Sequence, residues 1–222
     1  MTEIGFIVED LAADALGRDA DWWSIYDGSF PREEREPREA ILRSLADGLG
    51  TAIRMRSLPT GGKPTDTVGI ATLQFLPDVR CLFLVYLAVD GGRRGTGLGG
   101  QLFAETLRLG CLRHGGGDLD LVWEVDDPAT AKDETELRRR ERRLRFFDHQ
   151  GGRLLPYPYK QPAVDRVAPV PMRLMWKPRA GGPAAFQGSA ADLIRSIYHG
   201  KYGHVNGIPS GELDELLAGL EP

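Results

Sequence analysis

The stretch from Cys81 to Gly110 limits what this chain can fold into more than any other part of the sequence. A nearly unbroken apolar run, residues 82–89, leads into the glycine-rich segment 90–100, and apolar residues at helical spacing follow up to Leu107. Such an apolar run is typical of a strand buried on both faces. Glycines allow a tight turn that brings backbone amides close to a ligand, and the positive end of the following helix favours an anion. The sequence therefore predicts a phosphate cradle between a strand and a helix.

Two kinds of nucleotide-binding loop compete for this segment. The phosphate-binding loop of nucleotide hydrolases needs Gly-Lys-Ser or Gly-Lys-Thr at the start of the helix, and residues 99–101 read Gly-Gly-Gln. The dinucleotide fingerprint GxGxxG is met by Gly95, Gly97 and Gly100, but residues 90–94 separate it from the strand end, and the chain has no room for further strand–helix units. The first possibility fails, and the second stays open beside an ordinary strand–helix turn with surplus glycine.

A third possibility fits the residues better. Tyr86 to Asp90, followed after a short gap by Arg94 to Gly99, resembles the acyl-coenzyme A binding segment of the GCN5-related N-acetyltransferases (GNAT). The family's motif is Arg/Gln-x-x-Gly-x-Gly/Ala, which Arg94, Gly97 and Gly99 match. The resemblance covers roughly residues 4–178.

The resemblance implies an α/β fold of the α+β type, a mixed and mainly antiparallel central sheet of about six or seven strands flanked by helices. Residues 1–178 would form the acyltransferase domain. Residues 179–222 would form a short helical extension, whose last helix carries an apolar stripe that either folds back on the core or pairs with a second subunit.

The segments around the glycine turn agree with this layout. Residues 5–8, 51–58, 68–76 and 82–89 read as strands, and the last three are separated by turn residues alone. A dinucleotide fold would instead alternate strands and helices from the start. Further strands are expected at 119–125, 153–157 and 170–176, and helices follow Asp19, Pro37 and Gly97 and span 134–149. For the pair Trp22–Trp23, both core packing and contact with a substrate are open.

The resemblance also implies where acetyl-coenzyme A binds as co-substrate. The pantetheine arm would run along the strand before the turn and contact main-chain groups near Leu87, Ala88 and Val89. The pyrophosphate would lie on the backbone amides of the turn, which belong to Arg94, Gly95, Thr96, Gly97, Leu98 and Gly99. The implied reaction is N-acetylation of a primary amine on a small molecule or peptide.

Glu124 is the leading candidate for the general base. It lies in the predicted fifth strand, where a carboxylate can deprotonate an ammonium group directly or through water. Asp126 and Glu36 are weaker candidates. A strand glutamate can equally be a solvated edge residue.

The proton donor for the leaving thiolate is harder to find. Many members of the family use a tyrosine in the helix corresponding to 134–149, and Phe147 stands at the aligned position. Tyr86, Tyr157, Tyr159 or water are the possible substitutes. The missing tyrosine also leaves open a non-catalytic module that only binds acyl-coenzyme A.

Composition sets the remaining bounds. A net charge of −4 gives no sign of nucleic-acid binding, and neither a signal peptide nor a membrane span is indicated, so the cytoplasm is the expected compartment.

Cys81 and Cys111 are expected to be small apolar core residues, and the histidines have no metal-ligand spacing with them. Acidic residues at 33, 34, 36, 126 and 127 favour a cationic acceptor or are plain surface charge. Arginines between 138 and 145 form either a solvated helix face or a counter-charge for the coenzyme's phosphates.

Overall fold

A computed structural model describes residues 5–58, 66–115, 117–164, 168–183 and 186–220. The chain divides into two compact units, Met1–Gln74 with Leu84–Gly117 and Phe75–Phe83 with Asp118–Pro222. Strands β3 and β4 pass from one unit into the other, and the strand order is β1-β2-β3-β4-β5-β8-β6, with β7 paired to β8. Each unit is described separately below.

The first unit contains the predicted meander and the glycine turn. Its elements are β1 (Gly5–Leu11), α1 (Ala13–Gly17), α2 (Ala20–Ser29), the 3-10 turn η1 (Arg32–Glu34), α3 (Arg38–Ala46), β2 (Gly50–Leu58), β3 (Thr67–Leu76), β4 (Cys81–Val89), the 3-10 turn η3 (Gly91–Arg93) and α4 (Leu98–His114). β1 and β2 pair antiparallel, as do β2 and β3, with a register shift between Met55 and Arg56. The antiparallel order before the turn was predicted correctly.

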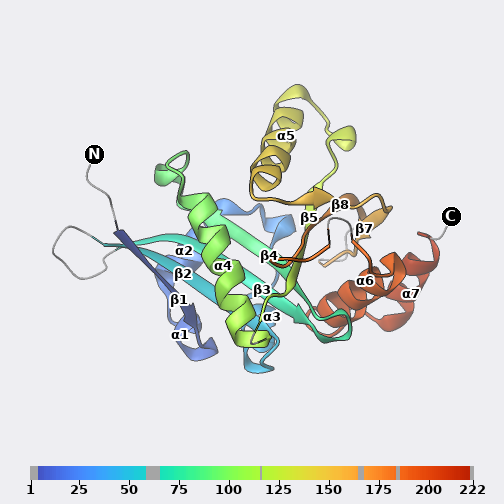
Figure 1. Ribbon diagram of the computed structural model, residues 1–222, viewed down its shortest axis with the longest axis horizontal. Helices are drawn as coiled ribbons and strands as arrows, with labels where there is room; N and C mark the ends of the chain where they lie inside the picture. The colour runs from blue at the N-terminus through green and yellow to red at the C-terminus, as the bar shows by residue number, and fades with distance from the viewer. Residues whose placement is uncertain (1–4, 59–65, 116, 165–167, 184–185, 221–222) are drawn as a thin grey trace. The chain divides into compact units, whose positions relative to one another are not determined.

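Strands β2, β3 and β4 of this unit are buried on both faces, because helices cover each face, whereas the edge strand β1 is mostly exposed or half-buried. Ala52, Ile70 and Ala88 pack against α1–α3, in a cluster that includes the fully buried Trp22 and Trp23 at 4% exposure. Their neighbours on the opposite side of the strands pack with Leu102 of α4, which crosses that face in Figure 1. Trp22 and Trp23 also donate their indole N–H groups to the carbonyls of Ile53 and Leu16, so core packing is the reading that holds.

The second unit is built on β8. Its elements are the 3-10 turn η2 (Pro77–Val79), β5 (Asp120–Asp126), the 3-10 turn η4 (Pro128–Thr130), α5 (Glu134–His149), β6 (Arg153–Leu154), β7 (Tyr159–Gln161), β8 (Val170–Lys177), α6 (Ala190–Ser196), the π-helix η5 (Ile197–Gly203) and α7 (Ser210–Ala218). β5, β6 and β7 each pair antiparallel with β8. Strand β7 was not predicted, because it has three residues and lies in a proline-rich connection.

The C-terminal segment folds back within the second unit, so the apolar stripe of its last helix is covered without a second subunit. Leu213 and Leu217 of α7 are buried, and α6 contacts both α7 and η2. Serine is a residue type that favours the cap position of a helix, but Ser210 is the first residue of α7, and Pro209 takes the cap position without a side-chain hydrogen bond. The predicted domain boundary at residue 178 stays a prediction.

The sheet of eight strands, mostly antiparallel and flanked by helices, confirms the predicted α/β architecture. It exceeds the expected strand number by one, because β6 lies within the strand predicted at 153–157 whereas β7 was not predicted. In the described part of the chain, no helix has both the length and the apolar character needed to cross a membrane.

Candidate functional site

The glycine turn is open to solvent at the start of α4. Gly95 and Gly97 have φ angles of +80° and +87°, a backbone conformation that residues with a Cβ rarely adopt. The turn from Arg94 to Gly97 is exposed, and a Cβ built on Gly95 or Gly97 would meet no atom within 4 Å. The amides of Leu98 and Gly99 lie in the first helical turn, where no acceptor exists within the helix. Among the described residues of the first unit, no side chain therefore fills the space beside Gly95 and Gly97 in the predicted phosphate cradle.

The side chain of Arg94 holds this turn against neighbouring residues. Its Nε donates to the carbonyl of Val89 at 3.3 Å, and its guanidinium also reaches Ser29 Oγ at 3.4 Å. Leu87 and Val89 are half-buried against the α4 side of the strands, whereas Ala88 is buried on the other side. The Val89 carbonyl, which lies in the stretch that the resemblance assigns to the pantetheine arm, thus already accepts a hydrogen bond from Arg94.

Tyr86 does not serve as a free proton donor. Its hydroxyl donates to the carbonyl of Glu34 and accepts from the amide of Glu36, both at 2.9 Å. Tyr26 contacts the Tyr86 ring edge-on and donates to the carbonyl of Glu36. Burial and the nearby Glu36 carboxylate raise the pKa of Tyr86 far above its usual range. Tyr86 instead holds the segment between α2 and α3 in place.

The variant Tyr86→Phe should be less stable than the native protein by about 1–3 kcal/mol, because the buried Glu36 amide and Glu34 carbonyl lose their partner. Chemical unfolding in urea measures the difference. The half-buried Tyr157 is the control, and Tyr157→Phe should be neutral. Equal stabilities of the two variants would contradict the clamping role.

Glu124 lies at the centre of a hydrogen-bonded cluster in the second unit. Tyr159 of β7 donates its hydroxyl to Glu124 Oε1, and Gln161 Nε2 donates to Oε2 at 2.9 Å. The hydroxyl of Tyr202, in the π-helix η5, lies 2.7 Å and 2.8 Å from the two carboxylate oxygens. Gln161 Nε2 also donates to the Tyr202 hydroxyl at 3.1 Å. Glu124 is therefore a held carboxyl group and not a solvated edge residue.

The cluster leaves Glu124 with an unusual proton affinity. Desolvation raises its pKa from 4.5 to about 7, although hydrogen bonds from Tyr159, Tyr202 and Gln161 and the charge of Lys201 pull it down. A carboxyl group with this pKa exchanges a proton near neutral pH, which is what a general base requires.

The raised pKa makes folding stability depend on pH. The folded protein holds the Glu124 proton more tightly than the unfolded chain, so this contribution to stability is complete below about pH 4.5 and lost as the pH rises through about 7. Glu124→Gln cannot ionise and should remove the contribution. We expect the melting temperature of the native protein to fall relative to that of Glu124→Gln between pH 4.5 and 7. Parallel curves across that interval would contradict the raised pKa.

No protein-family profile and no curated protein matches the sequence. Solved structures do match. A protein assigned to the GNAT acetyltransferases from Bacteroides thetaiotaomicron aligns with a TM-score of 0.62 at 20% identity, covering 91% of this chain and 99% of its own. ElaA from Escherichia coli aligns with a TM-score of 0.51 at 16% identity, covering 77% and 99%. An aminoglycoside 6'-N-acetyltransferase in complex with coenzyme A gives 0.53 at 14% identity, covering 77% and 96%.

The chain has the GNAT fold. At these identities the likeness concerns the fold, and it excludes the dinucleotide-binding architecture that the GxGxxG pattern left open.

Phe147, at the position where the GNAT resemblance expected a tyrosine, is a core residue. It is 7% exposed and lies 4.9 Å, between ring centroids, from Trp123. Trp123 and Glu124 are neighbours in a strand, so their side chains point to opposite faces. Phe147 thus packs on the face of β5 away from the Glu124 carboxyl.

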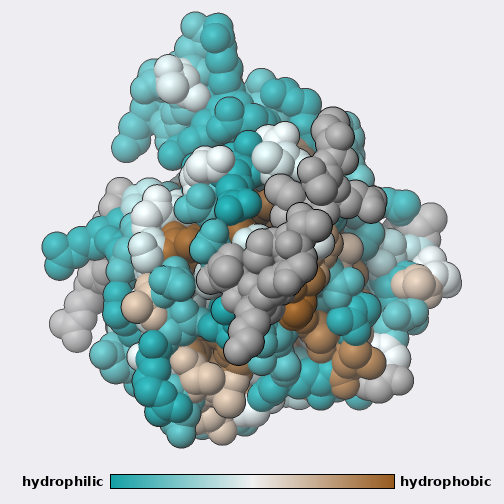
Figure 2. Space-filling model, turned by 90° about the vertical axis from the view of Figure 1, so that its left-hand side faces the viewer, coloured by the Kyte–Doolittle hydropathy of each residue, from teal (hydrophilic) through white to brown (hydrophobic). Residues whose placement is uncertain are grey.

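The arginines of α5 have partners of their own. Arg138, Arg143 and Arg145 form ion pairs with Glu134, Asp126 and Glu141. The lobe at the top of Figure 2, where Figure 1 places α5, is almost entirely hydrophilic. Intrahelical ion pairs on an exposed helix favour the solvated-face reading over a counter-charge for phosphates.

The remaining polar candidates have structural contacts. Arg140 binds Glu136 and the carbonyl of Asp127, which ties α5 to the preceding turn. Asp126 pairs with Arg143, and the Asp127 side chain caps η4. Glu36 is buried, while the side chain of Glu33 lies outside the described residues. These carboxylates therefore give little support for a cationic acceptor.

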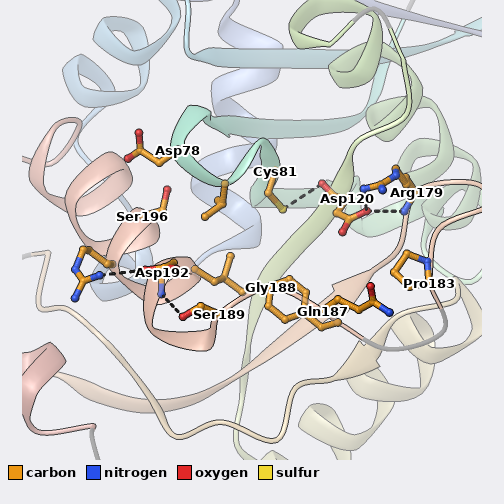
Figure 3. Close-up of a pocket in the computed structure, with 14 residues that line it drawn as sticks. Asp78, Cys81, Asp120, Arg179, Pro183, Gln187, Gly188, Ser189, Asp192 and Ser196 are labelled. Carbon is orange, nitrogen blue, oxygen red and sulfur yellow. Dashed lines mark hydrogen bonds and ion pairs between the residues drawn. The ribbon is translucent and has the colours of Figure 1, made fainter.

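A cavity of about 580 Å³ lies elsewhere in the second unit. In Figure 3, Cys81 and Arg179 both reach Asp120, and the Ser189 side chain caps the backbone at Asp192. None of the predicted site residues lines this cavity. Burial raises the pKa of the Cys81 thiol, so it stays protonated and apolar in character, as predicted.

Sequence reasoning named Glu124 and Tyr159 but missed Gln161, Lys201 and Tyr202. Tyr202 is 78 residues from Glu124 in the sequence, and no motif joins them. The signal available was an aromatic-rich stretch, Tyr198 to Tyr202, in a segment that had been assigned to an extension without a role.

Proposed function

We propose that the protein is an N-acetyltransferase that moves the acetyl group of acetyl-coenzyme A to a primary amine of a small molecule or peptide. The observation that carries the proposal is the open glycine turn between β4 and α4 of a GNAT fold, which offers two positive-φ glycines and helix-start amides that have no acceptor within the helix. A diphosphate is the ligand that such a turn fits.

The coenzyme contacts follow from this turn. Backbone amides from Arg94 to Gly99 bind the pyrophosphate, and the guanidinium of Arg94 braces the turn against Val89. The pantetheine arm lies along Leu87, Ala88 and Val89. Similarity to an enzyme solved with coenzyme A, the aminoglycoside acetyltransferase above, supports an acyl-coenzyme A ligand.

Glu124 is the proposed general base. The amine must lose a proton to attack the thioester carbonyl, and Glu124 accepts that proton because its pKa is near 7. Attack forms the amide C–N bond and breaks the C–S bond, and the departing thiolate takes up a proton. Among the tyrosines the sequence offered, Tyr159 is at the carboxyl cluster, while Tyr86 is engaged elsewhere.

A non-catalytic acyl-coenzyme A binding module is the second candidate. It is favoured by Phe147, which has no proton to donate and packs in the core against Trp123. A cytoplasmic location and a homodimer stay predictions from the sequence.

Release of free thiol from acetyl-coenzyme A separates the two candidates. The amines offered are a polyamine, an aminoglycoside and a lysine-containing peptide, and calorimetry with acetyl-coenzyme A measures binding in parallel. Thiol release above the amine-free rate supports the enzyme. Measurable binding without thiol release for any amine supports the module, and no binding at all overturns both.

A further inference from the structure

We infer that the C-terminal segment is part of the candidate active site, and that Tyr202 is a positioning residue for the Glu124 carboxyl. The inference rests on the proposed function and goes beyond it, because it assigns a role to a segment that the sequence left as an appendage. The geometry of four side chains carries it.

The first step is the contact itself. The Tyr202 hydroxyl is within hydrogen-bond distance of both Glu124 oxygens, at 2.7 Å and 2.8 Å, and receives a hydrogen bond from Gln161. With Tyr159 on Oε1 and Gln161 on Oε2, the carboxyl is fixed in rotation by donors from β7 and η5. A group that exchanges protons with a substrate benefits from such a fixed orientation.

The second step is that Tyr202 is itself firmly placed. It is 3% exposed, and its neighbour Tyr198 is fully buried and donates to the carbonyl of Lys160 in β7 at 2.7 Å. The π-helix between them is marked by the bond from the His204 amide to the His199 carbonyl, five residues back. π-helical turns occur often at functional sites. Tyr198 therefore anchors the helix to β7, and Tyr202 reaches the carboxyl.

The third step concerns charge. In the described part of this unit, the ionisable side chains that act most strongly on Glu124 are Tyr159 from β7 and Lys201 and Tyr202 from η5, and the charge of Glu124 in turn acts on Tyr198. Lys201 is 2% exposed, and its charge favours the ionised carboxylate. The C-terminal segment thus supplies both a hydrogen bond and a positive charge that offset desolvation of Glu124.

The test uses Tyr202→Phe, which keeps the buried ring and removes only the hydroxyl. Its matched control is Tyr157→Phe, which removes a hydroxyl from a half-buried tyrosine of the same unit that is not among the groups bonded to Glu124. The titration of Glu124 is followed by NMR of protein carrying ¹³C at the glutamate carboxyl, with Glu124→Gln identifying the signal. We expect the midpoint to rise by about one pH unit in Tyr202→Phe and to stay unchanged in Tyr157→Phe.

The pH dependence of thiol release is the second readout. A base whose pKa moves from about 7 to about 8 is about fivefold less ionised at pH 7, and the loss vanishes by about pH 9. A purely structural defect would lower the rate equally at every pH. An unchanged NMR midpoint in Tyr202→Phe overturns the inference. A raised midpoint with an unchanged pH–rate profile keeps the positioning role and instead removes Glu124 as the base.

Discussion

Glu124→Gln should lose at least a hundredfold in kcat while binding acetyl-coenzyme A as tightly as the native protein. The substitution keeps the shape of the side chain and removes its ability to accept a proton, and general bases contribute about 10²- to 10⁴-fold. The coenzyme contacts proposed at the glycine turn involve other residues. Thiol release gives kcat, and calorimetry gives the dissociation constant.

Glu141→Gln is the control for this substitution. Glu141 is a partly exposed residue of α5 in the same unit, and its ion pair with the exposed Arg145 contributes little to stability. It should leave kcat within about twofold of the native value. Native turnover in Glu124→Gln across the whole pH range would remove Glu124 from the mechanism.

Gly97→Ala should weaken the binding of acetyl-coenzyme A by about tenfold. A Cβ meets no atom in the free protein, but the φ angle of +87° strains any residue other than glycine by about 1–2 kcal/mol. Relief of that strain rotates the amides at the start of α4 away from the diphosphate. A tenfold change corresponds to about 1.4 kcal/mol, so the expected strain is sufficient.

Gly91→Ala is the matched control because its Cβ is equally unobstructed and its φ angle is not positive. It should bind acetyl-coenzyme A with nearly native affinity. Calorimetry on both variants measures the difference. Equal affinities would show that the geometry of the turn does not matter for the coenzyme, and the proposed phosphate cradle would fall.

The glycine turn could be predicted from the sequence because its conformation depends on residues that are close together in the chain. The apolar run of β4, the positive-φ glycines and the helix start all lie within about twenty residues and depend on backbone preference alone. The cap at Asp19 was also foreseen, and its side chain accepts from the amide of Trp22. Short-range rules of this kind need no knowledge of the tertiary structure.

Only part of the hydrogen-bonded cluster around Glu124 could be predicted from the sequence. Glu124 stood out as an acidic residue in an apolar strand, but its partners depend on how β7 and η5 reach β5 and β8. β7 has three residues and lies among prolines, so neither periodicity nor propensity reveals it. Phe147 is the opposite case. The motif placed it near the reacting groups, but in the structure its ring packs against Trp123 in the core.

The direction in which the Tyr202 side chain points depends on the number of residues in the π-helix η5. The turn already holds one residue more than an α-helical turn, so one further residue inserted between Ile197 and Tyr202 would rotate the phenol by about 100°. The apolar contacts of α7 do not depend on the direction of this phenol. A change of length in this short span would therefore move the Tyr202 hydroxyl away from Glu124 without altering any predicted site residue.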